Sequence, residues 1–229
     1  MLDNYSFSFT TVDNVTPSLV GYYTFNDVNT STLNDHADED NNQSFQDATL
    51  ISTATLHKGF NQRNNGTIKL DGNFAKINNN FPSIDNFTIS VWSMNGSQTY
   101  PIIGWDANIS LSIPEFKLHV ENNNIKVKLG SNTITCSNVV QRNIWNHIVV
   151  SVKNGEQNLY LNGLFCQNGT NSGTFKINSP VVLGDFQNNY TNVGNSYSSG
   201  YIDELKIFNN YLKSGEVKTL FINTGRNLE

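Results

Sequence analysis

The chain has 229 residues and a net charge of −5, and only 14% of its residues are charged. Its 14 Lys and Arg residues are scattered along the sequence, so a surface that follows nucleic-acid phosphates is not expected. No apolar run approaches the length of a bilayer span, and residues 1–20 lack the basic start and apolar core of a leader peptide. Composition therefore argues against nucleic-acid binding and membrane insertion, and leaves a cytosolic chain or one whose leader has been removed.

Asparagine is the dominant residue, with 38 positions. Asn favours turns, tolerates left-handed backbone and disfavours helix interiors. This bias indicates a protein with many loops between short strands.

Segments with alternating apolar residues recur along the chain. Residues 1–18 contain "YSFSF" and are expected to form an N-terminal extension or edge strand. Further strands are expected at 19–25, 87–92, 116–120, 125–130, 147–152, 158–163 and 180–184. The polar turns at 121–124 and 153–157 predict two hairpins. So many strands with little helix predict an all-β protein built as a two-sheet antiparallel sandwich.

The stretch "GYIDELKIFNNYLKSGEVKTLF" (200–221) changes from strand to helix periodicity. Strict alternation in its first half places Asp203 and Glu204 on opposite faces of a strand, with Glu204 toward solvent. The helix is expected to begin after Ser214 as its N-cap and to stop at Gly225, with Glu216 in the first turn. One short C-terminal helix is therefore predicted to dock on the sandwich.

Four segments together resemble the laminin-G-like jelly roll of the concanavalin A-like lectin and glucanase superfamily. They are "LVGYYTFND" with the later "IKLDGNFAKI", then "FTISVWSM", "WNHIVVSVKNGEQNLYLNG", and the closing stretch just quoted. The resemblance implies one concanavalin A-like jelly-roll domain over residues 19–229. Because this architecture hosts lectins, adhesion domains and glycosidases, function has to be argued from individual sites.

Catalytic carboxylates are not evident. Retaining glucanases similar to this family place alternating acids on one strand, because only residues of one parity face the same cleft. No such motif occurs here, and Asp203 and Glu204 are adjacent rather than alternating. His147 occupies a position that the resemblance marks as structural. We therefore expect no enzymatic activity.

A structural Ca²⁺ site is suggested by the resemblance, which matches Asp203 to an Asp that ties the closing strand to the opening strand. Backbone carbonyls near Tyr23–Asp27 would complete the ligand set. A carboxylate in an apolar strand must bind a cation, form an ion pair or accept hydrogen bonds, since isolated buried charge is costly. Calcium and simple hydrogen bonding both remain open for Asp203.

The two cysteines, Cys136 and Cys166, both lie on strand-like segments. In an oxidising compartment they could form one disulfide, and otherwise they would be two buried thiols. The sequence does not decide between these states.

A ligand surface is sought in loops that combine aromatic rings with amide and carboxylate groups. The predicted ligand-binding residues come from the loop at 185–201 and the segment "TYPIIGWD"; they are Tyr190, Asn192, Asn195, Tyr197, Trp105 and Asp106.

These features predict a non-catalytic binding module outside the cell or on its surface. Its expected partner is a glycan or glycoprotein, and the chain is expected to be one domain excised from a larger multidomain protein. The alternative is a protein–protein adhesion or spacer domain without a sugar site.

Overall fold

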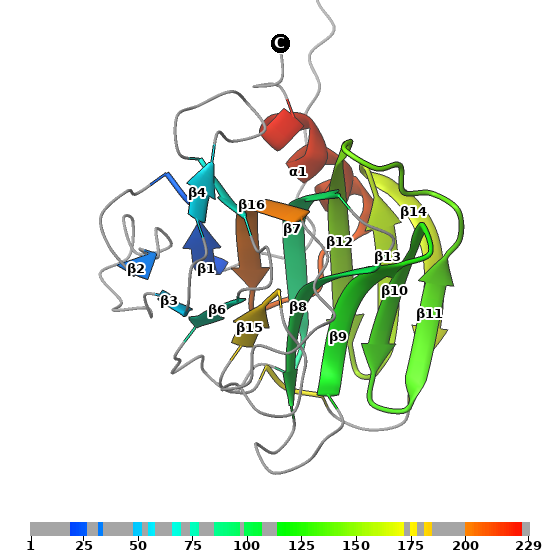
Figure 1. Ribbon diagram of the computed structural model, residues 1–229. Coiled ribbons are helices and arrows are strands. Elements are labelled where there is room, and N and C mark those ends of the chain that lie inside the picture. Colours follow the sequence, from blue (N-terminus) through cyan, green and yellow to red (C-terminus); the bar gives the residue numbers. More distant parts are fainter. Residues whose placement is uncertain are drawn as a thin grey trace, which may run out of the picture.

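The computed structural model describes residues 19–26, 32–33, 48–51, 55–57, 66–69, 74–77, 85–96, 99–106, 114–171, 175–177, 181–184 and 200–225. These residues form two eight-stranded antiparallel sheets that pack face to face, with one helix outside them (Figure 1). The predicted all-β jelly-roll sandwich with a C-terminal helix is thus confirmed. The N-terminal extension predicted at 1–18 lies outside the described residues.

Sheet A contains both the opening and the closing strand. Its order is β14 (Leu164–Thr170), β13 (Glu156–Leu161), β12 (Trp145–Lys153), β7 (Phe87–Asn95), β16 (Gly200–Phe208), β5 (Thr67–Lys69) and β4 (Thr55–His57). The opening strand β1 (Leu19–Tyr23) also pairs with β16. The opening and closing strands are therefore joined by hydrogen bonds within one sheet.

Sheet B contains the remaining strands. Its order is β11 (Asn132–Cys136), β10 (Asn124–Leu129), β9 (Pro114–Glu121), β8 (Thr99–Asp106), β15 (Val181–Leu183), β6 (Phe74–Ile77), β3 (Ala48–Ile51) and β2 (Thr32–Leu33). The hairpins predicted around 121–124 and 153–157 are β9–β10 and β12–β13.

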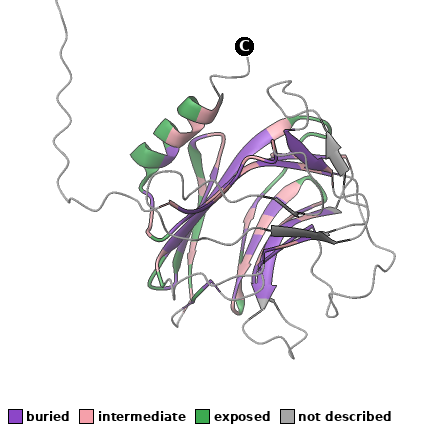
Figure 2. Cartoon of the chain, turned by 90° about the vertical axis from the view of Figure 1, so that its left-hand side faces the viewer, coloured by how far each residue is buried: buried purple, intermediate pink, exposed green. Residues whose placement is uncertain are grey.

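The core lies between the sheets and is filled by buried apolar residues of both sheets (Figure 2). At its centre Phe87 of sheet A meets Trp105 and Phe116 of sheet B, and the two sheet B rings stack with their centroids 4.2 Å apart. Each such buried apolar side chain contributes about 1.5–3 kcal/mol by leaving water. Buried apolar side chains such as these hold the two sheets together.

The abundance of Asn has a structural reason in the turns. In the described part of the chain, six of the eight non-glycine residues with positive φ are Asn. Asn122–Asn123, Asn154–Gly155 and Asn162–Gly163 provide two consecutive positive-φ residues at three hairpins. Tight hairpins require this backbone because its twist matches that of the strands.

Helix α1 (Ser214–Gly225) packs on the outer face of sheet A, with its exposed side turned to solvent (Figure 2). Its bounds agree with the prediction, but its N-cap does not. The Lys213 carbonyl accepts the first helical bond from Val217, and the Lys213 amide donates to Glu216. Lys213 is thus the N-cap, and the Ser214 hydroxyl lies 3.3 Å from the Tyr160 hydroxyl instead.

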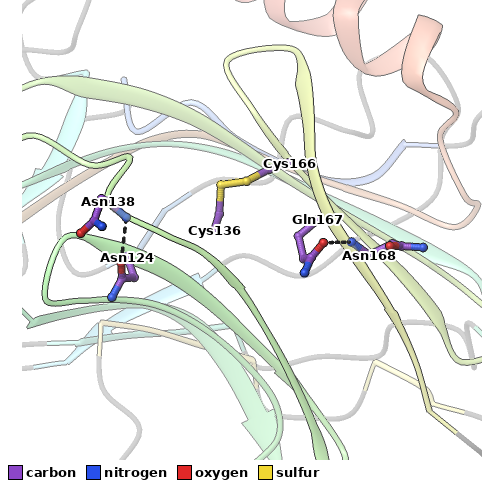
Figure 3. Close-up of a disulfide and its surroundings, with 6 residues drawn as sticks. All are labelled: Asn124, Cys136, Asn138, Cys166, Gln167 and Asn168. Atoms are coloured by element: carbon purple, nitrogen blue, oxygen red, sulfur yellow. Dashed lines mark hydrogen bonds between the residues drawn. A yellow bond between two sulfur atoms is a disulfide. The ribbon is translucent and has the colours of Figure 1, made fainter.

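Cys136 and Cys166 form a disulfide, which decides between the two states left open by the sequence (Figure 3). Cys136 lies on β11, at one edge of sheet B, and Cys166 lies on β14, at the corresponding edge of sheet A. The bond therefore joins the two sheets where the sandwich would otherwise open. Nearby, the Asn138 amide donates to the Asn124 side chain at 2.8 Å and orders the adjoining loop.

Candidate functional site

The predicted ligand surface is only partly within the described structure. Tyr190, Asn192, Asn195 and Tyr197 lie outside the described residues. Asp106 ends strand β8, and its side chain is not among those described. For these five residues the ligand-binding role stays a prediction.

The prediction for Trp105 is wrong in this structure, because its ring is only 2% exposed. The indole stacks on Phe116 and donates its N–H to the Lys176 carbonyl at 2.9 Å. Trp105 belongs to the inward-facing set of β8, since it lies opposite Phe116 in the β8–β9 ladder. A ring buried between the sheets cannot offer a stacking surface to a sugar.

The two adjacent acids of β16 do not point to opposite faces as predicted. Asp203 lies opposite Trp92, and the next pair on that face of β7 is Lys206 opposite Ser90. Two residues of β16 therefore face one of β7, and Glu204 is the extra residue of a β-bulge, with a φ of 49°. The bulge cancels the alternation on which the prediction depended.

Glu204 is consequently not a solvent-facing residue, and that prediction is also wrong. Its side chain is 15% exposed and forms an ion pair with Lys206 at 3.3 Å. It also accepts a 2.6 Å hydrogen bond from the Tyr22 hydroxyl, and the Lys206 ammonium lies 4.3 Å from the Tyr22 ring centroid. Glu204 therefore ties the opening strand to the closing strand.

Asp203 is 2% exposed, and both of its carboxylate oxygens accept hydrogen bonds. The donors are the Thr67 hydroxyl at 3.3 Å and the Glu204 amide at 2.8 Å. Within the described residues no three His, Cys, Asp or Glu side chains gather closely enough to hold a metal ion. Calcium at Asp203 would therefore need backbone carbonyls, and it stays a prediction.

A Ser–His pair is present, but it is covered. The Ser90 hydroxyl lies 2.8 Å from Nε2 of His147, and both residues are buried in sheet A. The His147 ring contacts Trp92 and the Phe221 ring of α1. Burial first, and the charge of Lys206 second, lower the pKa of His147 to about 3. The helix separates this pair from substrate, which agrees with the predicted structural role of His147.

Sequence reasoning missed a group of Lys and His side chains on the outer face of sheet B. Phe116, Leu118 and Val120 of β9 face the core, so Lys117 and His119 face outward. On β10, Lys126 and Lys128 face outward by the same alternation. The residues are separated in sequence by a turn, and only the hairpin register brings them together. Pairing the two predicted strands residue by residue would have found this group.

The chain belongs to the concanavalin A-like lectin/glucanases superfamily, whose family model matches residues 64–218. The resemblance stated from the sequence is thereby confirmed. Within the described residues no helix is both long and apolar enough to cross a membrane.

Two kinds of relatives are similar to this chain. A botulinum-like toxin of Enterococcus sp. (strain 3G1_DIV0629) is 31% identical over 127 residues, which cover 45% of this chain and 10% of the toxin. The receptor-binding domain of botulinum neurotoxin type G superposes with a TM-score of 0.67 at 17% identity, covering 90% of this chain and 51% of that one. A serotype D ligand-binding domain in complex with N-acetylneuraminic acid superposes with a TM-score of 0.66 at 18% identity, with 90% and 51% coverage.

These matches support conclusions of different scope. The structural matches, below a fifth in sequence identity, establish the fold alone. The chain spans about half the length of those structures and about a tenth of the curated toxin. Sugar binding by the serotype D domain is a property of that longer protein.

Proposed function

We propose that this chain is a non-catalytic binding module that acts outside the cell and recognises a glycan or glycoconjugate. The observation that supports it most is the shared fold, over 90% of the chain, with toxin domains that bind receptors. The chain would act as one domain of a larger protein. Recognition would use surface groups held by a rigid sandwich, since such scaffolds commonly position ligand-binding loops.

The disulfide supports the extracellular part of this proposal. Disulfides persist in oxidising compartments and are rare in the reducing cytosol. The Cys136–Cys166 bond joins the edges of both sheets, so the fold makes structural use of it.

The buried polar groups of sheet A support the non-catalytic part. Asp203 and Glu204 are engaged in hydrogen bonds and an ion pair between strands. His147 and Ser90 lie beneath α1. These groups stabilise the sheet, and each would have to break its present contacts to meet a substrate.

An array of glycans probed with the intact chain tests this function. We expect binding to a subset of glycans, with every bound glycan recovered chemically unchanged. Replacing residues 190–197 by a Gly/Ser segment of equal length is expected to weaken that binding. If this replacement leaves binding unchanged, the loop is not the ligand surface; if no glycan binds, the function proposed here is wrong.

A protein-binding or adhesion role is the second candidate, and one surface favours it. Leu164 and Phe165 are adjacent on the edge strand β14 and are 68% and 54% exposed. Exposed apolar residues on an edge strand favour association with another protein. Binding to a glycan-stripped receptor protein that is lost in Leu164→Ser/Phe165→Ser would support this candidate over the first.

A further inference from the structure

A row of side chains crosses the outer face of sheet A where β12 and β16 begin and β7 and β5 end. We call it the end row, and its members are Trp145, Met94, Tyr201 and Lys69. In the ladders of β12, β7, β16 and β5, each member lies directly opposite the next. Figure 1 shows β12, β7 and β16 as neighbouring strands. The end row is thus one continuous surface.

The end row faces outward and is partly exposed. Ile202 follows Tyr201 on β16 and belongs to the core, so alternation turns Tyr201 away from the core. In the next outward row, His147 and Trp92 are buried and contact the Phe221 ring of α1. All four members of the end row, by contrast, are partly exposed.

The two aromatic rings of the end row lean toward each other across β7. Trp145 and Tyr201 stand on strands two spacings apart, which separates their backbones by about 10 Å. Their ring centroids are only 6.4 Å apart, and the ring planes are inclined by 57°. Met94 occupies the strand position between them. The rings therefore form one platform with an apolar centre.

The start of β16 is held from its inner side by Tyr100 of β8. A Cβ atom at Gly200 would lie 2.2 Å from the Tyr100 ring, so glycine is required for the two sheets to approach this closely. Tyr100 is fully buried. Tyr201 is the next residue, and this packing fixes its backbone. A ring that is already fixed loses little conformational entropy when a ligand binds.

Lys69 gives the end row a polar end. Its ammonium group lies 5.9 Å from the Tyr201 ring centroid, within the range of a cation–π interaction. An ammonium group donates up to three hydrogen bonds and accepts none, so it suits a ligand rich in oxygen. It also repels a second cation, which argues against the quaternary ammonium ligands that aromatic rings otherwise bind.

A pyranose ring matches this combination of groups. One of its faces can present C–H groups, which pack on an aromatic ring, and its rim carries hydroxyl groups. Tyr201 is also the last residue of the segment 185–201, in which a ligand-binding loop is predicted. The end row therefore adjoins that loop along the chain.

We propose that the end row is a stacking subsite for one pyranose ring of a glycan. This inference rests on the function proposed above and deepens it by naming the binding residues and the mode of contact. The C–H face of the sugar packs on Trp145 and Tyr201, and a sugar oxygen accepts a hydrogen bond from Lys69. Binding should change little as salt is added, because stacking depends on apolar contact more than on charge.

Tryptophan fluorescence tests this contact directly, because the chain has three tryptophans. Trp92 and Trp105 are each 2% exposed, so the quencher acrylamide reaches chiefly Trp145. The probes are soluble polymers that carry many copies of lactose, cellobiose or sialyllactose, together with any glycan that the array detects. A bound sugar polymer should reduce quenching of the native chain, whereas a polymer carrying sorbitol, a polyol without a ring, should not.

Two substitutions test the rings separately. Trp145→Leu and Tyr201→Leu each remove one ring and keep an apolar side chain. The matched control is Tyr211→Leu, because Tyr211 is also a partly exposed tyrosine and lies just beyond the opposite end of β16. Each end-row variant should bind the sugar polymer roughly tenfold more weakly, and the control should bind it like the native chain. Urea unfolding checks the fold of every variant; where an end-row variant does not fold, the quenching of the native chain decides.

The outcomes separate this inference from the proposed function. A bound sugar polymer that leaves acrylamide quenching of the native chain unchanged would overturn the end row and retain a glycan-binding module. Folded end-row variants that bind as well as the native chain, or equal protection by the sorbitol polymer, would do the same. No binding of any glycan, here or on the array, would overturn both.

Discussion

The outer faces of the two sheets differ in what covers them. On sheet A, α1 covers His147, whose ring contacts Trp92 and Phe221, and these two rings also stack on each other. On sheet B, His119 lies half-buried among lysines on the outer side of β9. Burial is the first cause of the lowered pKa in both histidines; Lys206 adds to it at His147, and Lys117 and Lys126 add to it at His119, where Glu121 opposes them. Outward-facing strand positions are therefore packed under a helix on sheet A, whereas on sheet B they lie among charged side chains at the surface.

The largest loss of stability is expected from a substitution where α1 packs on sheet A. Trp92 stacks on Phe221 and donates its indole N–H to the Thr224 hydroxyl at 3.1 Å. Trp92→Ala should lower the free energy of unfolding by about 3–5 kcal/mol, because it leaves a cavity under the helix. Urea unfolding followed by circular dichroism measures this loss.

Phe165→Ala is the matched control, since this aromatic ring lies on the same sheet but is 54% exposed. Its cost should stay within about 1 kcal/mol, apart from its edge-on contact with Tyr160. Equal costs for the two substitutions would mean that the helix adds little to the stability of sheet A.

Removal of the disulfide should cause the second largest loss of stability. It closes a loop with a sequence separation of 30 residues. Cys136→Ser/Cys166→Ser should cost about 3–4 kcal/mol, because the unfolded chain regains the entropy of that loop. The measurement is urea unfolding of the native and double-serine chains, with reduced native chain as the control. A reduced chain as stable as the oxidised one would show that hydrogen bonds and packing alone hold the two edges together.

Acidification should destabilise the protein through His147, which lies beneath α1 on the outer face of sheet A. Its folded-state pKa of about 3 lies below the usual 6.5 of the unfolded chain, so the neutral form is favoured by folding. This contribution is complete above pH 6.5 and is lost as the pH falls from 6.5 toward 3, because only the unfolded state takes up the proton. The loss is about 1.4 kcal/mol per pH unit, or about 2 kcal/mol by pH 5.

His147→Gln isolates this effect from the carboxylates, which titrate lower. The free energy of unfolding should depend less steeply on pH between 5 and about 6.5 in the variant than in the native chain. Lys206, whose charge lowers the pKa of this ring, and its ion-pair partner Glu204 are unchanged by the substitution. Parallel pH profiles would show that His147 does not titrate on unfolding.

Sequence patterns predicted the architecture well because they are set by local periodicity. The strands, the β9–β10 and β12–β13 hairpins and the bounds of α1 depend on alternation and on turn residues such as Asn154 and Gly155. The side-chain directions around Glu204 could not be predicted, because a single inserted residue reverses the parity of the strand after it. The burial of Trp105 was missed for a related reason, since an aromatic residue near a loop can belong to either face.

The group of outward-facing lysines on β9 and β10 was missed because it depends on pairing between strands. Lys117 and Lys128 become neighbours only through the register of one hairpin. The pairing of Cys136 with Cys166 depends on the meeting of two sheets, so spacing in the sequence does not determine it.

Calcium binding at Asp203 would place a cation beside strand β16 of sheet A. If the predicted site exists, Ca²⁺ at ten times its dissociation constant should stabilise the native chain by about 1.4 kcal/mol. Melting in EDTA and in excess Ca²⁺ measures the shift, and Asp203→Asn should abolish it. No shift in the native chain would leave the hydrogen bonds from Thr67 and the Glu204 amide as the reason for a carboxylate at this position.

Added salt should have the smallest effect of these changes. It nevertheless distinguishes most directly between the outer faces of sheet A and sheet B. Added salt screens Lys117 and Lys126 and should raise the pKa of His119 part of the way back toward its usual value. The pKa of His147 should stay low, because its side chain is fully buried and ions do not enter a ring stack under a helix. Titration of both imidazole rings by NMR at low and high salt measures the difference, with Lys117→Gln as a second way to raise the His119 value. An equal response of the two rings would mean that the lysines do not set the field at His119, and the contrast between a covered and a charged face would then reduce to a difference in burial.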